Sequence, residues 1–197
     1  MDCVEEIWRD LNQFMSSPTT AQSQETFRIL HYLKQAPGLG LFFSTKSSIQ
    51  LKAFNDSDWA GCLDTRRSIT GFSVYIGDSV ISWRSKKQPT VSRSSSKVEY
   101  RALATTTCEL QWLTYLLTDL HIPFKQPALL YCDNLYPPDC CQSAREKVRS
   151  RFVKLLPVSS SHQLADIFTK SLSPSLFSNL RTKLGMFNLY SHLKWAS

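Results

Sequence analysis

The amino-acid sequence predicts a mixed α/β fold in which helices flank a five-stranded mixed sheet. Three segments with alternating apolar residues follow one another at residues 49–56, 68–77 and 79–85, and a Gly-Asp turn joins the last two. A long helical segment at residues 96–120 then leads into a short apolar strand at 127–134, which is typical of a crossover between parallel strands. We therefore expect a sheet that is antiparallel at one edge and parallel in the middle.

Helices are predicted where apolar residues recur every three or four positions. The first helical segment, residues 24–35, stops at the strong breaker Ala-Pro-Gly at residues 36–38. The long helix begins with Ser96 and Glu99 at the spacing of a capping box. A stripe of leucines along its length predicts that one face is buried.

The regular pattern fails after Asn134. Pro137 and Pro138 forbid a regular helix, so residues 135–144 are expected to form an irregular, weakly packed loop. Further elements are predicted beyond it: a short basic helix, a fifth strand and two helices, at residues 145–152, 152–160, 161–172 and 176–187.

The length of 197 residues predicts one domain with terminal extensions. A helical lead-in at residues 1–46 is expected to precede an α/β domain at residues 47–172. A helical tail at residues 173–197 is expected to follow that domain.

The composition disfavours several classes of protein. Lys and Arg outnumber Asp and Glu by 23 to 16, and the resulting net charge of +7 favours a polyanionic partner. No apolar run approaches a membrane span, and the acidic N-terminal segment lacks the features of a signal peptide. We therefore expect an intracellular protein of the cytoplasm or nucleus, neither secreted nor membrane-bound. The six cysteines are expected to be free thiols, because no Cys-x-x-Cys pair indicates a zinc site.

Four acidic residues lie at the ends of predicted elements, namely Asp56, Glu99, Asp133 and Asp166. Ligand sites in sheets of this kind gather beyond the carboxyl ends of the parallel strands. Carboxylates that converge there repel one another, so a cluster is stable only when cations bridge it. Mg²⁺ or Mn²⁺ suits such oxygen ligands, and two such ions would support phosphodiester hydrolysis.

Each of these acids also has a purely structural alternative. Asp56 could cap the turn after its strand, and Glu99 could serve only the capping box. Asp133 precedes Asn134 in good turn chemistry, and Asp166 suits the start of a helix through the helix dipole. Residue types and spacing alone leave both readings open.

A basic, serine-containing stretch runs from the third strand into the start of the long helix. Its cations and hydroxyls can neutralise and hydrogen-bond phosphates, which predicts contacts to a nucleic-acid backbone. The alternative is a solvated sheet edge on which lysine prevents strand pairing. The candidate nucleic-acid-binding residues are Arg84, Lys86, Lys87, Arg93, Ser94, Ser95, Lys97 and Arg101.

Residues 53–113 strongly resemble the ribonuclease H domain of copia-type retrotransposon Pol polyproteins, especially those of plants. The motifs are DSDWAG at the first strand, VEYRAL in the long helix, LLYCDN at the fourth strand and QLADIFTKSL near the C-terminus. Residues 10–43 resemble the segment that joins the reverse transcriptase of this family to its ribonuclease H.

The resemblance implies a ribonuclease H-like fold and an enzyme that cuts the RNA strand of RNA–DNA hybrids with two Mg²⁺ ions. By motif position the four catalytic and metal-binding carboxylates are Asp56, Glu99, Asp133 and Asp166. It also implies a reverse transcriptase as partner where the polyprotein is intact.

The chain departs from the family pattern at two places. Ser96-Lys97 replaces the usual alanine-glutamate pair, and one helix is missing after Asn134. Two hypotheses therefore stand: a Mg²⁺-dependent ribonuclease H, or a catalytically inactive, degenerate fragment that at most binds nucleic acid.

Overall fold

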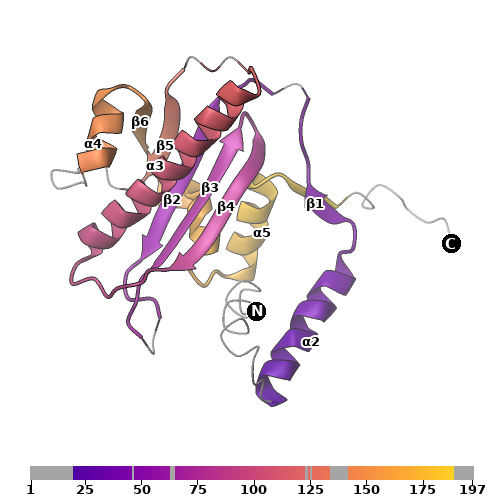
Figure 1. Cartoon of the computed structure of the whole chain (residues 1–197). Coiled ribbons are helices and arrows are strands. Elements are labelled where there is room, and N and C mark those ends of the chain that lie inside the picture. The colour runs from indigo at the N-terminus through magenta and orange to yellow at the C-terminus, as the bar shows by residue number, and fades with distance from the viewer. Residues whose placement is uncertain are drawn as a thin grey trace. The chain divides into compact units, whose positions relative to one another are not determined.

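The computed structural model describes residues 20–45, 47–62, 65–122, 124, 126–133 and 142–188. Internal contacts divide the chain into two units (Figure 1). One unit comprises residues 43–170, and the other combines residues 1–42 with residues 171–197. The lead-in and the tail predicted from the sequence thus fall largely into the same unit.

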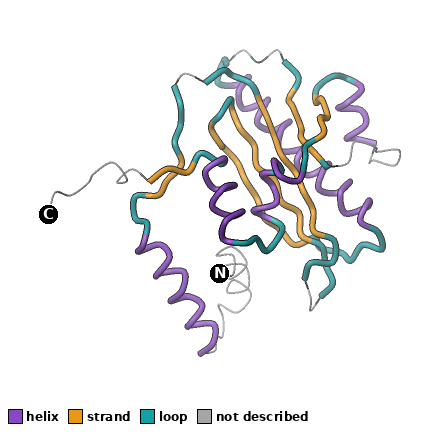
Figure 2. Tube along the Cα trace, turned by 180° about the vertical axis from the view of Figure 1, so that it is seen from behind, coloured by secondary structure: helices purple, strands orange, loops and turns teal. Residues whose placement is uncertain are grey.

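A five-stranded mixed sheet forms the centre of the larger unit, with the strand order β4-β3-β2-β5-β6 (Figure 2). The strands β2 (Leu51–Asp58), β3 (Ile69–Ile76) and β4 (Ser79–Lys87) form an antiparallel meander. The strands β5 (Ala128–Cys132) and β6 (Val153–Pro157) continue the sheet in parallel with β2. The predicted fold class is therefore confirmed, and the parallel pairs extend from the middle to one edge.

The turn between β3 and β4 depends on Gly77, which has a positive φ of 59°. A Cβ atom at this position would lie 1.8 Å from Oγ of Ser47. The same hydroxyl accepts a hydrogen bond from the backbone N–H of Asp78 at 2.7 Å. Conformation and space both require glycine here, as the Gly-Asp signature predicted.

The helix α3 (Ser95–Asp119) covers one face of the sheet (Figure 1). Its N-cap is Ser94, whose backbone is extended and whose hydroxyl accepts a hydrogen bond from the N–H of Lys97 at 3.4 Å. The predicted capping box of Ser96 and Glu99 is therefore wrong, because both residues already lie inside the helix. The run of serines offers several equivalent caps, and sequence alone does not select among them.

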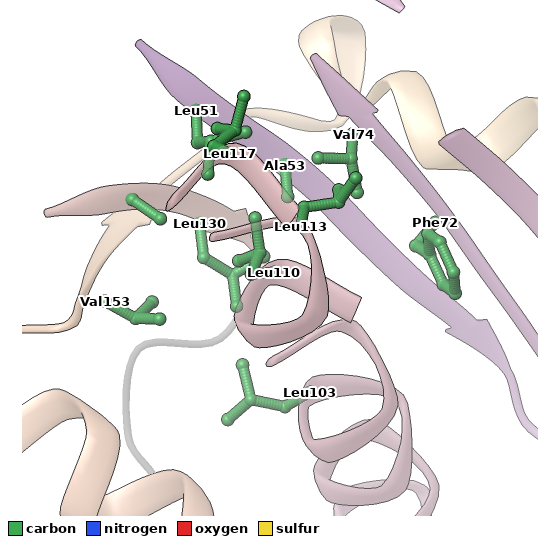
Figure 3. Close-up of a cluster of buried hydrophobic side chains, with 11 residues drawn as sticks. Leu51, Ala53, Phe72, Val74, Leu103, Leu110, Leu113, Leu117, Leu130 and Val153 are labelled. Carbon is green, nitrogen blue, oxygen red and sulfur yellow. The ribbon is translucent and has the colours of Figure 1, made fainter. Parts of the chain in front are cut away.

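A hydrophobic core lies between α3 and the sheet (Figure 3). Leu110 of α3 and Leu51, Val74 and Leu130 of the strands are completely buried. Burial of each such side chain contributes about 1.5–3 kcal/mol, so α3 and the sheet hold each other in place. The cluster consists of Leu51, Ala53, Phe72, Val74, Leu103, Leu110, Leu113, Leu117, Ala128, Leu130 and Val153.

The segment between β5 and β6 contains α4 (Gln142–Arg149). The helix starts earlier than predicted, so the expectation of an irregular loop up to residue 144 is wrong for its last three positions. Residues 135–141, with Pro137 and Pro138, lie outside the described residues.

The segment after β6 forms two 3₁₀ helices, η1 (Ser160–His162) and η2 (Leu164–Phe168), where the sequence predicts one α-helix. Gln163 separates them, because its backbone is extended and its side chain accepts a hydrogen bond from the N–H of Ala165. All five residues of η2 are buried, so apolar spacing did not distinguish a buried 3₁₀ turn from an amphipathic helix.

The smaller unit contains two helices and a two-stranded sheet. The helices are α2 (Thr20–Gln35) and α5 (Pro174–Lys183). The strands β1 (Leu39–Leu41) and β7 (Met186–Asn188) pair antiparallel, and neither is predicted from the sequence. The last helix ends before Gly185, whose φ of 79° allows the chain to turn into β7. No helix in the described part of the chain is long and apolar enough to cross a membrane.

Candidate functional site

The ammonium group of Lys170 links two of the predicted acids. It lies 2.6 Å from Oδ1 of Asp166 in η2 and 3.3 Å from Oδ2 of Asp56 in β2. The hydroxyl of Thr169 also donates a hydrogen bond to Oδ2 of Asp56. Two carboxylates that are more than a hundred positions apart in the sequence are thus held together by one cation.

Gln163 connects a third acid to this pair. The side chain is fully buried, and its Nε2 donates to Oδ1 of Asp133 at 2.8 Å and to the carbonyl oxygen of Asn55 at 3.1 Å. Its Oε1 accepts from the N–H of Ala165 at 3.3 Å. One amide therefore joins the end of β2, the residue that follows β5 and the start of η2.

The thiol of Cys132, the residue before Asp133, is affected by two of the predicted acids. Burial, together with the charges of Asp133 and Glu99, raises the pKa of this thiol to about 11. The charge of Asp133 also acts on Asp166. The structure thus connects Asp56, Asp133 and Asp166 through Lys170 and Gln163, at the end of the sheet where β2 and β5 terminate. For Glu99 it shows an electrostatic effect on Cys132. The catalytic and metal-binding roles of the four acids stay predictions.

Gly71 allows η2 to approach the sheet so closely. It lies directly opposite Asp56 in the β2–β3 register. A Cβ atom on Gly71 would lie 2.7 Å from Cβ of Phe168 and 2.7 Å from Cγ2 of Thr169. The hydroxyl of Ser85 fastens the same segment by donating to the carbonyl oxygen of Phe168 at 2.6 Å. The position of Asp166 relative to Asp56 therefore depends on the absence of a side chain in β3.

The acids have the electrostatics of a cation site. Burial raises the pKa of Asp166 to about 6, with the hydrogen bond from Lys170 opposing the shift and the charge of Asp56 adding to it. The pKa of Lys170 is raised, since its hydrogen bond to Asp166 and the charges of Asp56 and Asp166 outweigh its own burial. This pair of carboxylates requires a positive charge at neutral pH.

The donor atoms suit a divalent ion, because all are carboxylate oxygens, the ligands that Mg²⁺ and Mn²⁺ prefer. Within the described ranges, however, no three His, Cys, Asp or Glu side chains are arranged so that they could hold a metal ion. The amino group of Lys170 lies between Asp56 and Asp166 and supplies the positive charge there.

The raised pKa of Asp166 predicts a pH dependence of stability. The native state binds this proton more tightly than the unfolded chain, whose aspartate has a pKa of 3.8. Stability from this group is therefore present below about pH 4 and is lost as the pH rises through 6. In metal-free buffer, we expect Asp166→Asn to gain about 2–3 kcal/mol relative to the wild type between pH 4 and pH 7.

Chemical denaturation at several pH values measures this gain. The matched control is Asp78→Asn, because Asp78 is exposed and pairs with Lys52 at the surface. A difference between Asp166→Asn and the wild type that is the same at pH 4 and pH 7 would contradict the raised pKa.

The predicted nucleic-acid-binding residues divide into two groups. Arg84, Lys86, Arg93, Lys97 and Ser95 are exposed, and Lys87 is half-buried. Lys86 and Lys87 lie at the same end of the sheet as Asp56, since the β3 residues opposite them, Thr70 and Ile69, directly precede Gly71.

Two members of the basic stretch have structural contacts. Arg101 donates a hydrogen bond to the hydroxyl of Ser92 at 2.8 Å and to Oε1 of Gln88 at 3.3 Å. The hydroxyl of Ser94 caps α3. These contacts hold the connection between β4 and α3 in place beside the acids.

Sequence reasoning missed four residues of the site: Gly71, Gln163, Thr169 and Lys170. A glycine inside a strand pattern indicates a close backbone approach, and this signal was present at Gly71. A lysine four positions after an acid was also visible at Lys170. Nothing local in the sequence shows that Gln163 reaches Asp133.

Comparison with known proteins shows what the chain is related to. No family model matches it. It is 39% identical over 192 residues to the retrovirus-related Pol polyprotein from transposon RE1 of Arabidopsis thaliana, covering 89% of this chain and 13% of that protein. It is 37% identical over 195 residues to the corresponding polyprotein from transposon RE2 of the same plant, covering 91% and 13%. The chain therefore spans only about an eighth of the length of these relatives.

Among solved structures, the N-terminal ribonuclease H domain of Rv2228c from Mycobacterium tuberculosis aligns with 68% of this chain and 98% of its own. The TM-score is 0.43 and the identity is 13%. The sequence relationships define the class: a domain homologous to a segment of retrotransposon Pol polyproteins. More particularly, its homologues are copia-type Pol polyproteins of Arabidopsis transposons, as its motifs predicted.

Proposed function

We propose that the larger unit is a ribonuclease H that hydrolyses the RNA strand of an RNA–DNA hybrid. The observation that carries this proposal is the network in which Lys170 joins Asp56 to Asp166 while Gln163 joins Asp133 to the same segment. The homology to retrotransposon Pol polyproteins supports it, because this chain has all four acids in the motifs that resemble that family.

Asp56, Glu99, Asp133 and Asp166 would hold two Mg²⁺ ions. When bound, the ions would supply a nucleophile from water and stabilise the charge that develops on the phosphate and leaving oxygens. The chain's own residues prepare this site. Gln163 orients the carboxylate of Asp133, and Thr169 orients that of Asp56.

Lys170 has a separate task in this proposal. Its side chain is 39% exposed, so it can leave Asp56 and Asp166 when another cation neutralises them. The released ammonium then faces solvent beside the site, where it can neutralise a phosphate oxygen of the substrate. The exposed cations Arg84, Lys86, Arg93 and Lys97 would hold the backbone, and contacts to 2′-hydroxyls would select RNA.

A second candidate function is nucleic-acid binding without cleavage. It is favoured by a specific observation: Lys170 already neutralises Asp56 and Asp166, and no metal-holding group of three side chains is present within the described ranges. In this case the carboxylates would have only a structural role, and the basic surface would remain functional.

Cleavage of a labelled RNA–DNA hybrid decides between these functions. We expect the full chain to cut the RNA strand in Mg²⁺, to stop in excess chelator, and to leave single-stranded RNA and duplex DNA intact. Asp133→Asn is the control for a contaminating nuclease and is expected to be inactive. Hybrid binding without any Mg²⁺-dependent cleavage would instead establish the second function.

A further inference from the structure

The helix α4 and the turn after it carry a second group of cations. Arg145, Lys147, Arg149 and Arg151 occupy four of seven consecutive positions, with Glu146 as the only acid among them. Arg149 and Arg151 are exposed, and Arg145 and Lys147 are half-buried. We call these four residues the α4 basic cluster. None of them belongs to the basic stretch predicted from the sequence.

Arg151 adopts a backbone conformation that normally selects glycine. Its φ is 58°. Its N–H donates to the carbonyl oxygen of Val148 at 3.1 Å, and the N–H of Phe152 donates to that of Lys147 at 3.0 Å. These two bonds define a Schellman motif with Arg151 at the left-handed position. A side chain is less favourable than glycine there, a local cost that the chain also accepts at His121 in the same motif at the end of α3.

Charge repulsion adds a second local cost. Arg145 and Arg149 are one helical turn apart, and like charges at this spacing destabilise a helix. The helix dipole favours cations in the last turn, which accounts for Lys147 and Arg149. In the described part of the chain, no ion pair joins Lys147, Arg149 or Arg151 to a carboxylate.

The cluster has a defined position relative to the acids. The N–H of Ala128, the first residue of β5, donates to the carbonyl oxygen of Phe152 at 3.0 Å, so the end of α4 lies at the start of β5. Asp133 follows the other end of that strand. Five residues of strand rise by about 16 Å, which is about five phosphates along one nucleic-acid strand.

We propose that the α4 basic cluster binds the phosphate backbone of the nucleic acid, about five nucleotides away from the carboxylate site. The location of the substrate in this proposal rests on the proposed function. The cluster fits a phosphate chain, because its four cations surround only one small exposed apolar side chain among the described side chains of α4, that of Val148 at 37%. Around these cations Phe152 is half-buried with the ammonium of Lys147 over its ring at 5.5 Å, so it is not available as an anchor.

The test is hybrid binding in chelator, where no cleavage occurs, measured by fluorescence anisotropy as a function of salt. The variant is Arg149→Gln with Arg151→Gly. For a hybrid of about 18 base pairs, the slope of log affinity against log salt should become flatter by about two. For a hairpin-stabilised hybrid of about 3 base pairs, which is shorter than the five nucleotides between the acids and the cluster, the change in slope should be smaller.

A stability measurement separates binding from a structural role. Because glycine is preferred at the left-handed position, Arg151→Gly alone should raise the melting temperature by about 2–4 °C while it weakens binding of the long hybrid. The matched control is Lys52→Gln with Lys154→Gln. These lysines flank Leu129 in register, on the sheet face opposite the core. Their replacement removes two positive charges, as the cluster variant does. This control should affect the long and short hybrids equally.

Each other outcome would overturn the proposal. If the Arg151→Gly variant is more stable but has an unchanged salt slope, Arg151 only terminates the helix and does not bind nucleic acid. Equal effects on long and short hybrids would place it elsewhere relative to the acids, and tighter binding of polyglutamate than of the long hybrid would indicate a protein partner. If the salt slopes are unchanged and cleavage is normal, binding by the α4 basic cluster is wrong but the nuclease proposal stands. If binding depends on the cluster but no cleavage occurs, the nuclease proposal is wrong but binding by the cluster stands.

Discussion

Asp56→Asn is expected to reduce cleavage of an RNA–DNA hybrid by at least about 10³-fold while the protein remains folded. The carboxylate of Asp56 accepts the hydroxyl of Thr169 and faces the ammonium of Lys170. Asparagine keeps the shape of the side chain but loses the charge that a bound cation requires. The thermal stability should not fall, because the substitution relieves the repulsion between Asp56 and Asp166.

Asp78→Asn provides the matched control for this loss. It removes the same charge from an aspartate that is 81% exposed and lies in the β3–β4 turn, at the far end of β3 from Gly71. The rate of cleavage and the melting temperature of both variants should be measured in parallel. A fully active Asp56→Asn protein would exclude the proposed site, whatever the behaviour of the control.

Gly71→Ala is expected to lower both stability and activity. The new methyl group would lie 2.7 Å from Cβ of Phe168 and 3.2 Å from the carbonyl oxygen of Ala165, so η2 must move away from the sheet. Overpacking of this kind costs about 1–3 kcal/mol. Because Asp166 moves with η2, cleavage per folded molecule should fall by about 100-fold, as expected for a displacement near 1 Å.

Gly40→Ala is the corresponding control, because a Cβ atom at Gly40 meets nothing within 4 Å. It should leave both stability and cleavage unchanged. Denaturant unfolding gives the stability, and cleavage rates corrected for the folded fraction give the activity. If Gly71→Ala destabilises the protein but cuts at the wild-type rate per folded molecule, the close contact of η2 with β3 does not position Asp166.

The strands β2, β3 and β4 and the helix α3 could be predicted because alternation and apolar spacing are local properties. The short strands β1 and β7 could not, since each has three residues and exists only through its pairing with the other. For η2, burial on all sides removed the polar face that distinguishes one helical period from another. The start of α3 was misplaced by serines that are equivalent as caps.

The acidic residues of the candidate site could be predicted from the sequence, but the residues that contact and position them could not. Acidic residues at element ends and the family motifs pointed to Asp56, Glu99, Asp133 and Asp166. The contacts that arrange them come from Gln163 and Thr169, whose partners are up to 113 positions away in the sequence. Such contacts are products of the completed fold, so no local pattern reveals them.

The pairing of β1 with β7 has a consequence for how the chain is made. Leu39 pairs with Asn188, so β1 leaves the ribosome 149 residues before the position that pairs with it. Contacts of such high sequence separation form late, because the entropy of closing a long loop opposes them. Until then the apolar residues Leu39 and Leu41 are without their strand partner, and exposed apolar segments of this kind associate with other nascent chains. Folding of residues 43–170 as a separate compact unit shortens the flexible loop that must close before β1 and β7 can pair.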